Sequence, residues 1–148
     1  MYIDAHQHYW KIDRDDYGWI TPEIPVLFRD YLPADLEPEL MKHGISRTIV
    51  VQAAPTVEET EYILGLSEQA ESVAGVIGWL DLASPSFQAE FERLSRHPKF
   101  TGLRVMIQEM ADPGVLFDPA IYRSALISCG AGCAGGPAGA GRSASPAH

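Results

Sequence analysis

Short apolar runs alternate with amphipathic segments along the first 127 residues of the chain. Residues 47–52 form a β-branched, almost continuously apolar run, which is typical of a strand buried on both faces. Three further strands are predicted at residues 1–4, 73–80 and 100–107. Helical patterns separate the strands. The chain therefore predicts an α/β fold of about four strand–helix units, with a parallel sheet and right-handed crossovers.

Helix signals follow the predicted strands. Residues 35–43 fit a short helix, and Gly44 stands just after its last turn. Patterns that mark helix starts follow at Thr56 with Glu59 (a capping box), at Ser84-Pro85 and at Asp118-Pro119. Residues 9–32 are aromatic and acidic but irregular, which predicts a long loop after the first strand.

The composition changes after about Ile127. Residues 128–148 are almost entirely Gly, Ala, Ser and Pro, and such a segment buries too little apolar surface to offset its ordering entropy. We expect residues 1–127 to form the folded unit and residues 128–148 to form a disordered, low-complexity tail. The last helix is interrupted in mid-course. This favours an aberrant end, such as a shifted reading frame, over a natural flexible tail.

Two histidines, His6 and His8, stand where the first strand ends. Successive side chains of a strand alternate between its faces, so both rings should point the same way, together with Asp4. Two imidazoles side by side can bind one divalent metal ion. A short His-x-His motif also occurs by chance, but its place at a strand end favours a metal or polar catalytic role.

Other polar residues fall at the carboxyl ends of the predicted strands, where parallel α/β folds bind ligands. Gln52 is expected either to bind substrate or to satisfy loop backbone groups. Trp79 fits a pocket wall or the core, and Asp81 fits a turn. Arg104 lies on an apolar strand and needs a partner, which is either a substrate carboxylate held at two points or a structural acid.

Composition narrows the function classes. Hydrophobic residues make up 46% of the chain and charged residues 21%, and the net charge of −9 is spread along the sequence. Nucleic-acid and anionic-membrane surfaces need clustered Lys and Arg, so neither partner is expected. The chain lacks a long apolar stretch and a signal-like start, so a cytoplasmic location is the default expectation.

Four ordered sequence blocks together resemble the amidohydrolase-related TIM-barrel family, in the branch of L-fuconolactonases and dicarboxylate lactonases. The blocks are IDAHQHYW at residues 3–10, VVQA at 50–53, GVIGWLDL at 75–82 and GLR at 102–104. The resemblance implies a (β/α)8 barrel that hydrolyses a lactone, or a related ester or amide, with an activated water. The substrate would be a small molecule, such as a lactone or carboxylate.

The resemblance also implies site roles. His6 and His8 would line the site and hold a divalent metal, zinc or manganese, although some members of the branch work without a tightly bound metal. Gln52, Trp79 and Arg104 would bind substrate. Arg104 would also act catalytically, by holding a substrate carboxylate or the developing oxyanion.

The chain departs from the family pattern because a full barrel needs about 250 residues and eight strands. With about four strand–helix units, it is expected to form only the N-terminal half of a (β/α)8 barrel. Later histidines and an Asp that family members carry have no counterpart here. The alternatives are therefore a metal-dependent decarboxylase of the same superfamily or a non-catalytic fragment. Unpaired edges of a half-barrel predict aggregation or pairing with another chain, and a second copy of this chain, which would make a homo-oligomer, is one such partner.

Overall fold

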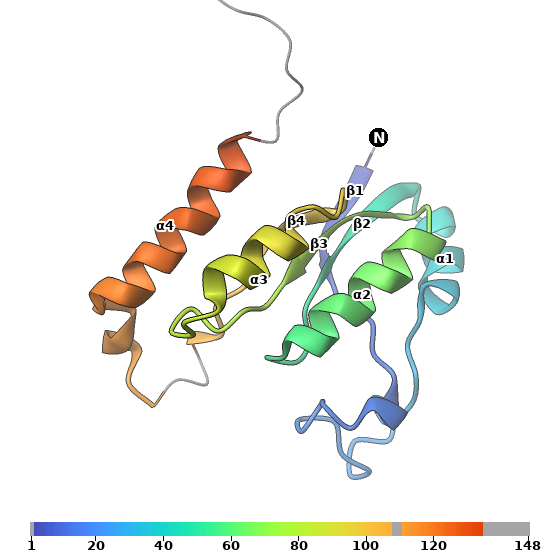
Figure 1. Ribbon diagram of the computed structural model, residues 1–148. Helices are drawn as coiled ribbons and strands as arrows, with labels where there is room; N and C mark the ends of the chain where they lie inside the picture. The colour runs from blue at the N-terminus through green and yellow to red at the C-terminus, as the bar shows by residue number, and fades with distance from the viewer. Residues whose placement is uncertain (1, 108–110, 135–148) are drawn as a thin grey trace, which may run out of the picture.

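The computed structural model describes residues 2–107 and 111–134. Strands and helices alternate along the chain (Figure 1). The elements are β1 (Tyr2–Gln7), the 3-10 helix η1 (Ile12–Arg14), α1 (Pro33–Lys42), β2 (Ile45–Val51), α2 (Val57–Gln69), β3 (Val73–Gly78), α3 (Phe87–Leu94), β4 (Phe100–Leu103), the 3-10 helix η3 (Pro113–Phe117) and α4 (Pro119–Ala134).

The four strands form one parallel sheet in the order β1-β2-β3-β4. Sequential parallel strands joined by right-handed crossovers place their connecting helices on one face of the sheet. Figure 1 shows α1, α2 and α3 on that face, with α4 beside α3. The carboxyl ends of the strands share one edge with the long loop that carries η1. The predicted parallel α/β architecture is confirmed.

The core lies between the sheet and its helices. Val50 and Val76 are almost completely buried against Ile63 of α2 and Phe87 of α3. Strand side chains alternate faces, so the β2 positions on the same side as Val50 supply the core and the intervening positions face the opposite side. A second, smaller cluster joins the long loop to Ala53 and Ala54, just after β2.

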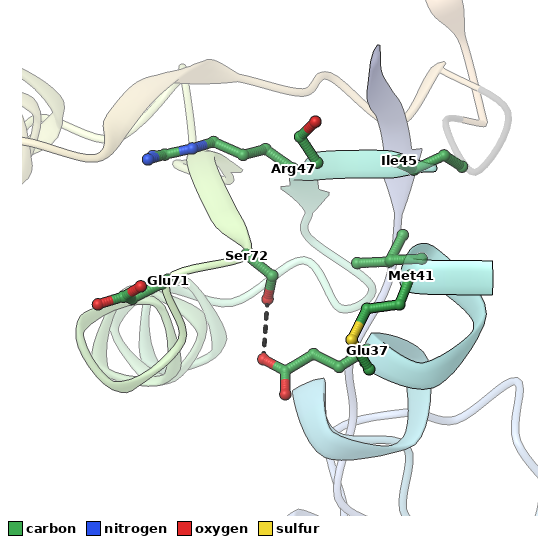
Figure 2. Close-up of a pocket in the computed structure, with 8 residues that line it drawn as sticks. Glu37, Met41, Ile45, Arg47, Glu71 and Ser72 are labelled. Carbon is green, nitrogen blue, oxygen red and sulfur yellow. Dashed lines mark hydrogen bonds between the residues drawn. The ribbon is translucent and has the colours of Figure 1, made fainter. Parts of the chain in front are cut away.

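A pocket of about 400 Å³ lies at the amino ends of the strands (Figure 2). The Ser72 hydroxyl donates to Oε1 of Glu37 across it, at 3.1 Å, and this bond ties α1 to the start of β3. Arg47 and Met41 line the same pocket. Parallel α/β folds bind ligands beyond the carboxyl ends of their strands, so we interpret this pocket at the amino ends as structural. Among the described helices, none is long and apolar enough to cross a bilayer.

Several predicted boundaries need correction. β1 continues to Gln7, so His6 lies within the strand, and β4 already ends at Leu103. α3 begins at Phe87 and not at Pro85, because the Ser84 hydroxyl accepts from the Ser86 amide in a turn that precedes the helix. Thr56 caps α2, but the capping box is incomplete because the Glu59 carboxylate bonds elsewhere.

The predicted division of the chain at residue 128 stays a prediction, but the first part of the predicted disordered tail is helical. α4 runs without a break past Ile127 to Ala134. Helical backbone bonds are local and Ala has the highest helix propensity, so the alanines of this segment can continue the helix past Ile127, although its glycines lower the propensity. The rest of the predicted tail, residues 135–148, lies outside the described residues.

Gly78 gives a test of the packing between β3 and α2. A Cβ at Gly78 would overlap the side chain of Thr60, whose hydroxyl accepts from the Trp79 amide at 2.8 Å. We expect Gly78→Ala to lower the free energy of unfolding by about 1–3 kcal/mol, because overpacking displaces Thr60. Gly102→Ala is the control, since a Cβ there meets nothing within 4 Å. Equal urea-unfolding midpoints for the two variants would contradict this packing.

Candidate active site

His6 and His8 face each other at the carboxyl end of β1. Their Nε2 atoms are 3.3 Å apart, and the rings meet edge to face with centroids 4.9 Å apart. Gln7 between them pairs with Val50, which faces the helix layer. The two histidines therefore point to the opposite side of the sheet, as the alternation predicted.

The ring of His8 is fixed by the neighbouring strand. Its Nδ1 lies 2.8 Å from the carbonyl oxygen of Val51, at the end of β2. A carbonyl can only accept, so Nδ1 carries the hydrogen and Nε2 of the neutral ring keeps its lone pair. Burial lowers the pKa of His8 below 6.5, and the charges of His6 and Arg104 act in the same direction. At neutral pH, His8 therefore presents an unprotonated Nε2.

This arrangement fits two ligands of a zinc ion. Two imidazole nitrogens at 2.0–2.1 Å from a tetrahedral zinc are themselves about 3.3 Å apart. The observed separation of the Nε2 atoms is 3.3 Å. The bond from Nδ1 of His8 to a carbonyl is also the usual outer support of a metal-binding histidine. Among the described residues, however, no cluster of three or more His, Cys, Asp or Glu side chains is present.

The expectation that Asp4 joins the pair is wrong. Asp4 pairs with Thr48 and Gln7 pairs with Val50, so a register shift separates the two pairings. Thr48 and Val50 face the same side, which puts Asp4 on the helix side of β1. Burial is the main cause that raises the pKa of Tyr9, a core residue, and the charges of Glu37 and Asp4 act in the same direction. An irregularity of this kind reverses the alternation of faces, and the residue types gave no sign of it.

Arg104 and Gln52 lie next to His8. Nη1 of Arg104 is 3.4 Å from the carbonyl oxygen of Gln52, and the guanidinium is close enough to lower the pKa of His8. Within the described residues Arg104 forms no ion pair, so no acidic side chain among them neutralises its charge. The Gln52 side chain is fully buried, and neither of its amide atoms bonds a described residue.

Trp79 is less clearly part of this group. It lines a cavity of about 200 Å³ with Val105 and residues of η3 and α4. Neither His6 nor His8 lines this cavity, so the predicted role of Trp79 in substrate binding stays a prediction. Asp81 accepts from the Ala83 amide at 2.9 Å, as the turn interpretation predicted.

Glu59 is a residue that the sequence pattern did not identify as part of the site. Its fully buried carboxyl group accepts from the Ala53 amide at 3.1 Å through Oε1, while Oε2 has no described partner. Burial is the main reason that the pKa of Glu59 rises to about 8. A capping-box interpretation places this side chain on its own helix. The partner that Glu59 has instead, the Ala53 amide, lies in the loop after β2 and comes close to Glu59 only in the folded chain.

The profile of the amidohydrolase family matches residues 3–129, which include both histidines, Gln52 and Arg104. This chain belongs to the amidohydrolase family.

Individual relatives agree with this assignment. L-fucono-1,5-lactonase of Burkholderia ambifaria is 43% identical over 119 residues, which cover 80% of this chain and 41% of that protein. L-fucono-1,5-lactonase of Burkholderia multivorans is 38% identical over 120 residues, covering 81% and 40%. A crystal structure of a Burkholderia multivorans amidohydrolase with bound zinc superimposes with a TM-score of 0.75 at 35% identity.

The amidohydrolase chain spans only part of these relatives. It covers about 41% of the length of the first lactonase and 44% of the zinc-bound structure. Four successive strand–helix units in that share confirm the predicted N-terminal half of a (β/α)8 barrel.

A titration of His8 by NMR tests the electrostatics of the site. We expect the chemical shifts of the His8 ring protons to report a pKa below 6.5, because burial disfavours the charged ring. Since the pKa is lowered in the folded state, stability should fall as the pH drops from 6.5 through that value. Arg104→Met should raise the titration midpoint of His8 but leave it below 6.5, because burial remains. A midpoint at or above 6.5 in the unmodified chain would contradict this environment.

A second pH dependence belongs to Glu59. An unfolded chain ionises this group near pH 4.5, whereas the folded chain holds the proton up to about pH 8. The native chain should therefore lose stability relative to Glu59→Gln as the pH rises between these values, by at most about 1.4 kcal/mol per unit. Urea unfolding of both proteins at several pH values measures the difference. A difference that does not change with pH would show that Glu59 is ionised in the folded chain.

Proposed function

We propose that this chain supplies part of the active site of a hydrolase that opens a small lactone ring with water. The observation that supports this most is the His6–His8 pair, whose Nε2 atoms converge while Nδ1 of His8 is held by Val51. The similarity to two L-fucono-1,5-lactonases makes an aldonolactone the first substrate to test. We keep the cytoplasm as the proposed location.

His6 and His8 would hold a divalent cation, with zinc as the first candidate. When bound, the cation would supply Lewis-acid activation of the water and of the lactone carbonyl. The Val51 carbonyl keeps His8 in the tautomer that leaves Nε2 free to bind. The described residues offer only these two ligands in one place, so further ligands would have to come from outside them.

Arg104 would stabilise negative charge on the substrate or product during the reaction. Hydrolysis forms a bond between the water oxygen and the carbonyl carbon, breaks the ring C–O bond, and passes a proton to the ring oxygen. The product is a hydroxy acid with a new carboxylate. Arg104 lies beside His8 without an ionic partner among the described residues, so its guanidinium can take a substrate carboxylate, the developing oxyanion or this product.

A fusion protein tests the proposed activity. Residues 1–127 would replace the matching segment of the Burkholderia ambifaria lactonase, and acid release from L-fucono-1,5-lactone would be followed with a pH indicator. We expect zinc-dependent hydrolysis by the fusion and none above background by the 148-residue chain alone. His8→Ala in the fusion should reduce kcat/KM by more than about 100-fold, the upper effect of losing an outer support of a metal site.

His43→Ala is the matched control, because His43 is an exposed histidine paired with Glu39 on α1. Full activity in the folded His8→Ala fusion would contradict the proposal. Release of CO2 from a carboxylate substrate without ring opening would favour the decarboxylase alternative.

Arg104→Lys separates the charge of Arg104 from its geometry. Lysine keeps the charge but loses the planar two-point contact, so we expect kcat/KM of the fusion to fall by about ten- to a hundredfold. A lactone that carries a carboxylate and one that lacks it should be compared. A loss confined to the carboxylate-bearing lactone assigns Arg104 to that group, and an equal loss on both assigns it to the oxyanion. Unchanged kinetics on both would make Arg104 structural.

A further inference from the structure

The segment that follows β2 holds the site side chains through three consecutive peptide groups. The Val51 carbonyl accepts from His8 at 2.8 Å, and the amide of the same peptide donates to Ile77 of β3 at 2.8 Å. The next carbonyl, of Gln52, accepts from Arg104 at 3.4 Å. The third, of Ala53, accepts from the indole of Trp19 at 2.9 Å. The orientation of these peptides therefore sets where the side chains lie.

The middle peptide is bound on both sides. Its carbonyl belongs to Gln52 and faces Arg104, while its amide belongs to Ala53 and donates to Glu59 at 3.1 Å. A peptide group is planar and this one is trans, so its N–H and C=O point in opposite directions and rotate as one body. A side chain that holds the N–H consequently also aims the C=O.

Glu59 is suited to hold this peptide. It lies in the first turn of α2, which Thr56 caps, and its side chain is fully buried. The helix is anchored to β3 by Thr60, which bonds the Trp79 backbone. A carboxyl group on such a support has little freedom, and bonds that share a peptide strengthen each other.

We propose that Glu59 is a positioning residue that orients Arg104 through the Gln52–Ala53 peptide. The site role of Arg104 rests on the proposed function, but the contact itself does not. Glu59 acts here as an acceptor at Oε1, which both the neutral and the ionised carboxyl provide. Glu59→Gln keeps that acceptor and nearly the same shape, so it should preserve the contact.

The test observes Arg104 directly in the 148-residue chain. A guanidinium that is held by a carbonyl rotates slowly about its terminal C–N bonds, and ¹⁵N NMR measures this rate without metal or substrate. We expect Glu59→Ala to speed the rotation about fivefold, the factor for loss of one ordinary hydrogen bond. Glu59→Asp should act in the same direction, because it withdraws the carboxylate by one methylene. Glu59→Gln should match the unmodified chain.

Ser67→Ala is the control for general loosening. Ser67 is equally buried on α2, but its hydroxyl bonds Leu64, away from the site. The proposal stands if Glu59→Ala, or Glu59→Asp where the first does not fold, frees Arg104 while Glu59→Gln and Ser67→Ala do not. It is overturned if Arg104 already rotates freely in the unmodified chain, if the Asp variant leaves it held, or if Ser67→Ala frees it equally. An inactive fusion or a lack of zinc binding would count against the proposed function alone.

Discussion

The hydrogen bond between Nδ1 of His8 and the Val51 carbonyl is the interaction on which the site depends. It crosses from β1 to β2 at the carboxyl edge of the sheet, so it forms only when the first two strands pair in the observed register. It decides which ring nitrogen carries the hydrogen, and burial keeps the ring neutral by lowering its pKa. It holds the His8 ring in the position where its Nε2 lies 3.3 Å from Nε2 of His6.

The parallel topology brings the remaining groups to the same edge. β2 and β4 are not neighbours in the sheet, yet Arg104, just after β4, reaches across β3 to the Gln52 carbonyl. The long loop docks on the same segment through Trp19, and α2 docks there through Glu59. Three backbone groups just after β2 thus bond side chains from three other parts of the chain: Arg104 after β4, Trp19 of the long loop and Glu59 of α2.

The order of elements and the facing of the two histidines could be predicted from the sequence, because both depend on short-range periodicity. The position of Asp4 could not, since one register irregularity between β1 and β2 reverses its face. Glu59 looked like a cap residue because its partner, Ala53, becomes visible only once α2 packs beside the end of β2. The end of α4 was missed because poor core-forming residues can still continue a helix.

We propose that His6 and His8 together bind one metal ion through their Nε2 atoms. X-ray absorption at the zinc edge of the zinc-loaded 148-residue chain tests it most directly. We expect two imidazole nitrogens at about 2.0–2.1 Å from the zinc in the unmodified chain, with the remaining positions filled by light atoms such as water oxygen. Both His6→Ala and His8→Ala should lose this pattern. A bound zinc that retains two imidazole ligands in either variant, or no bound zinc in the unmodified chain, would contradict it.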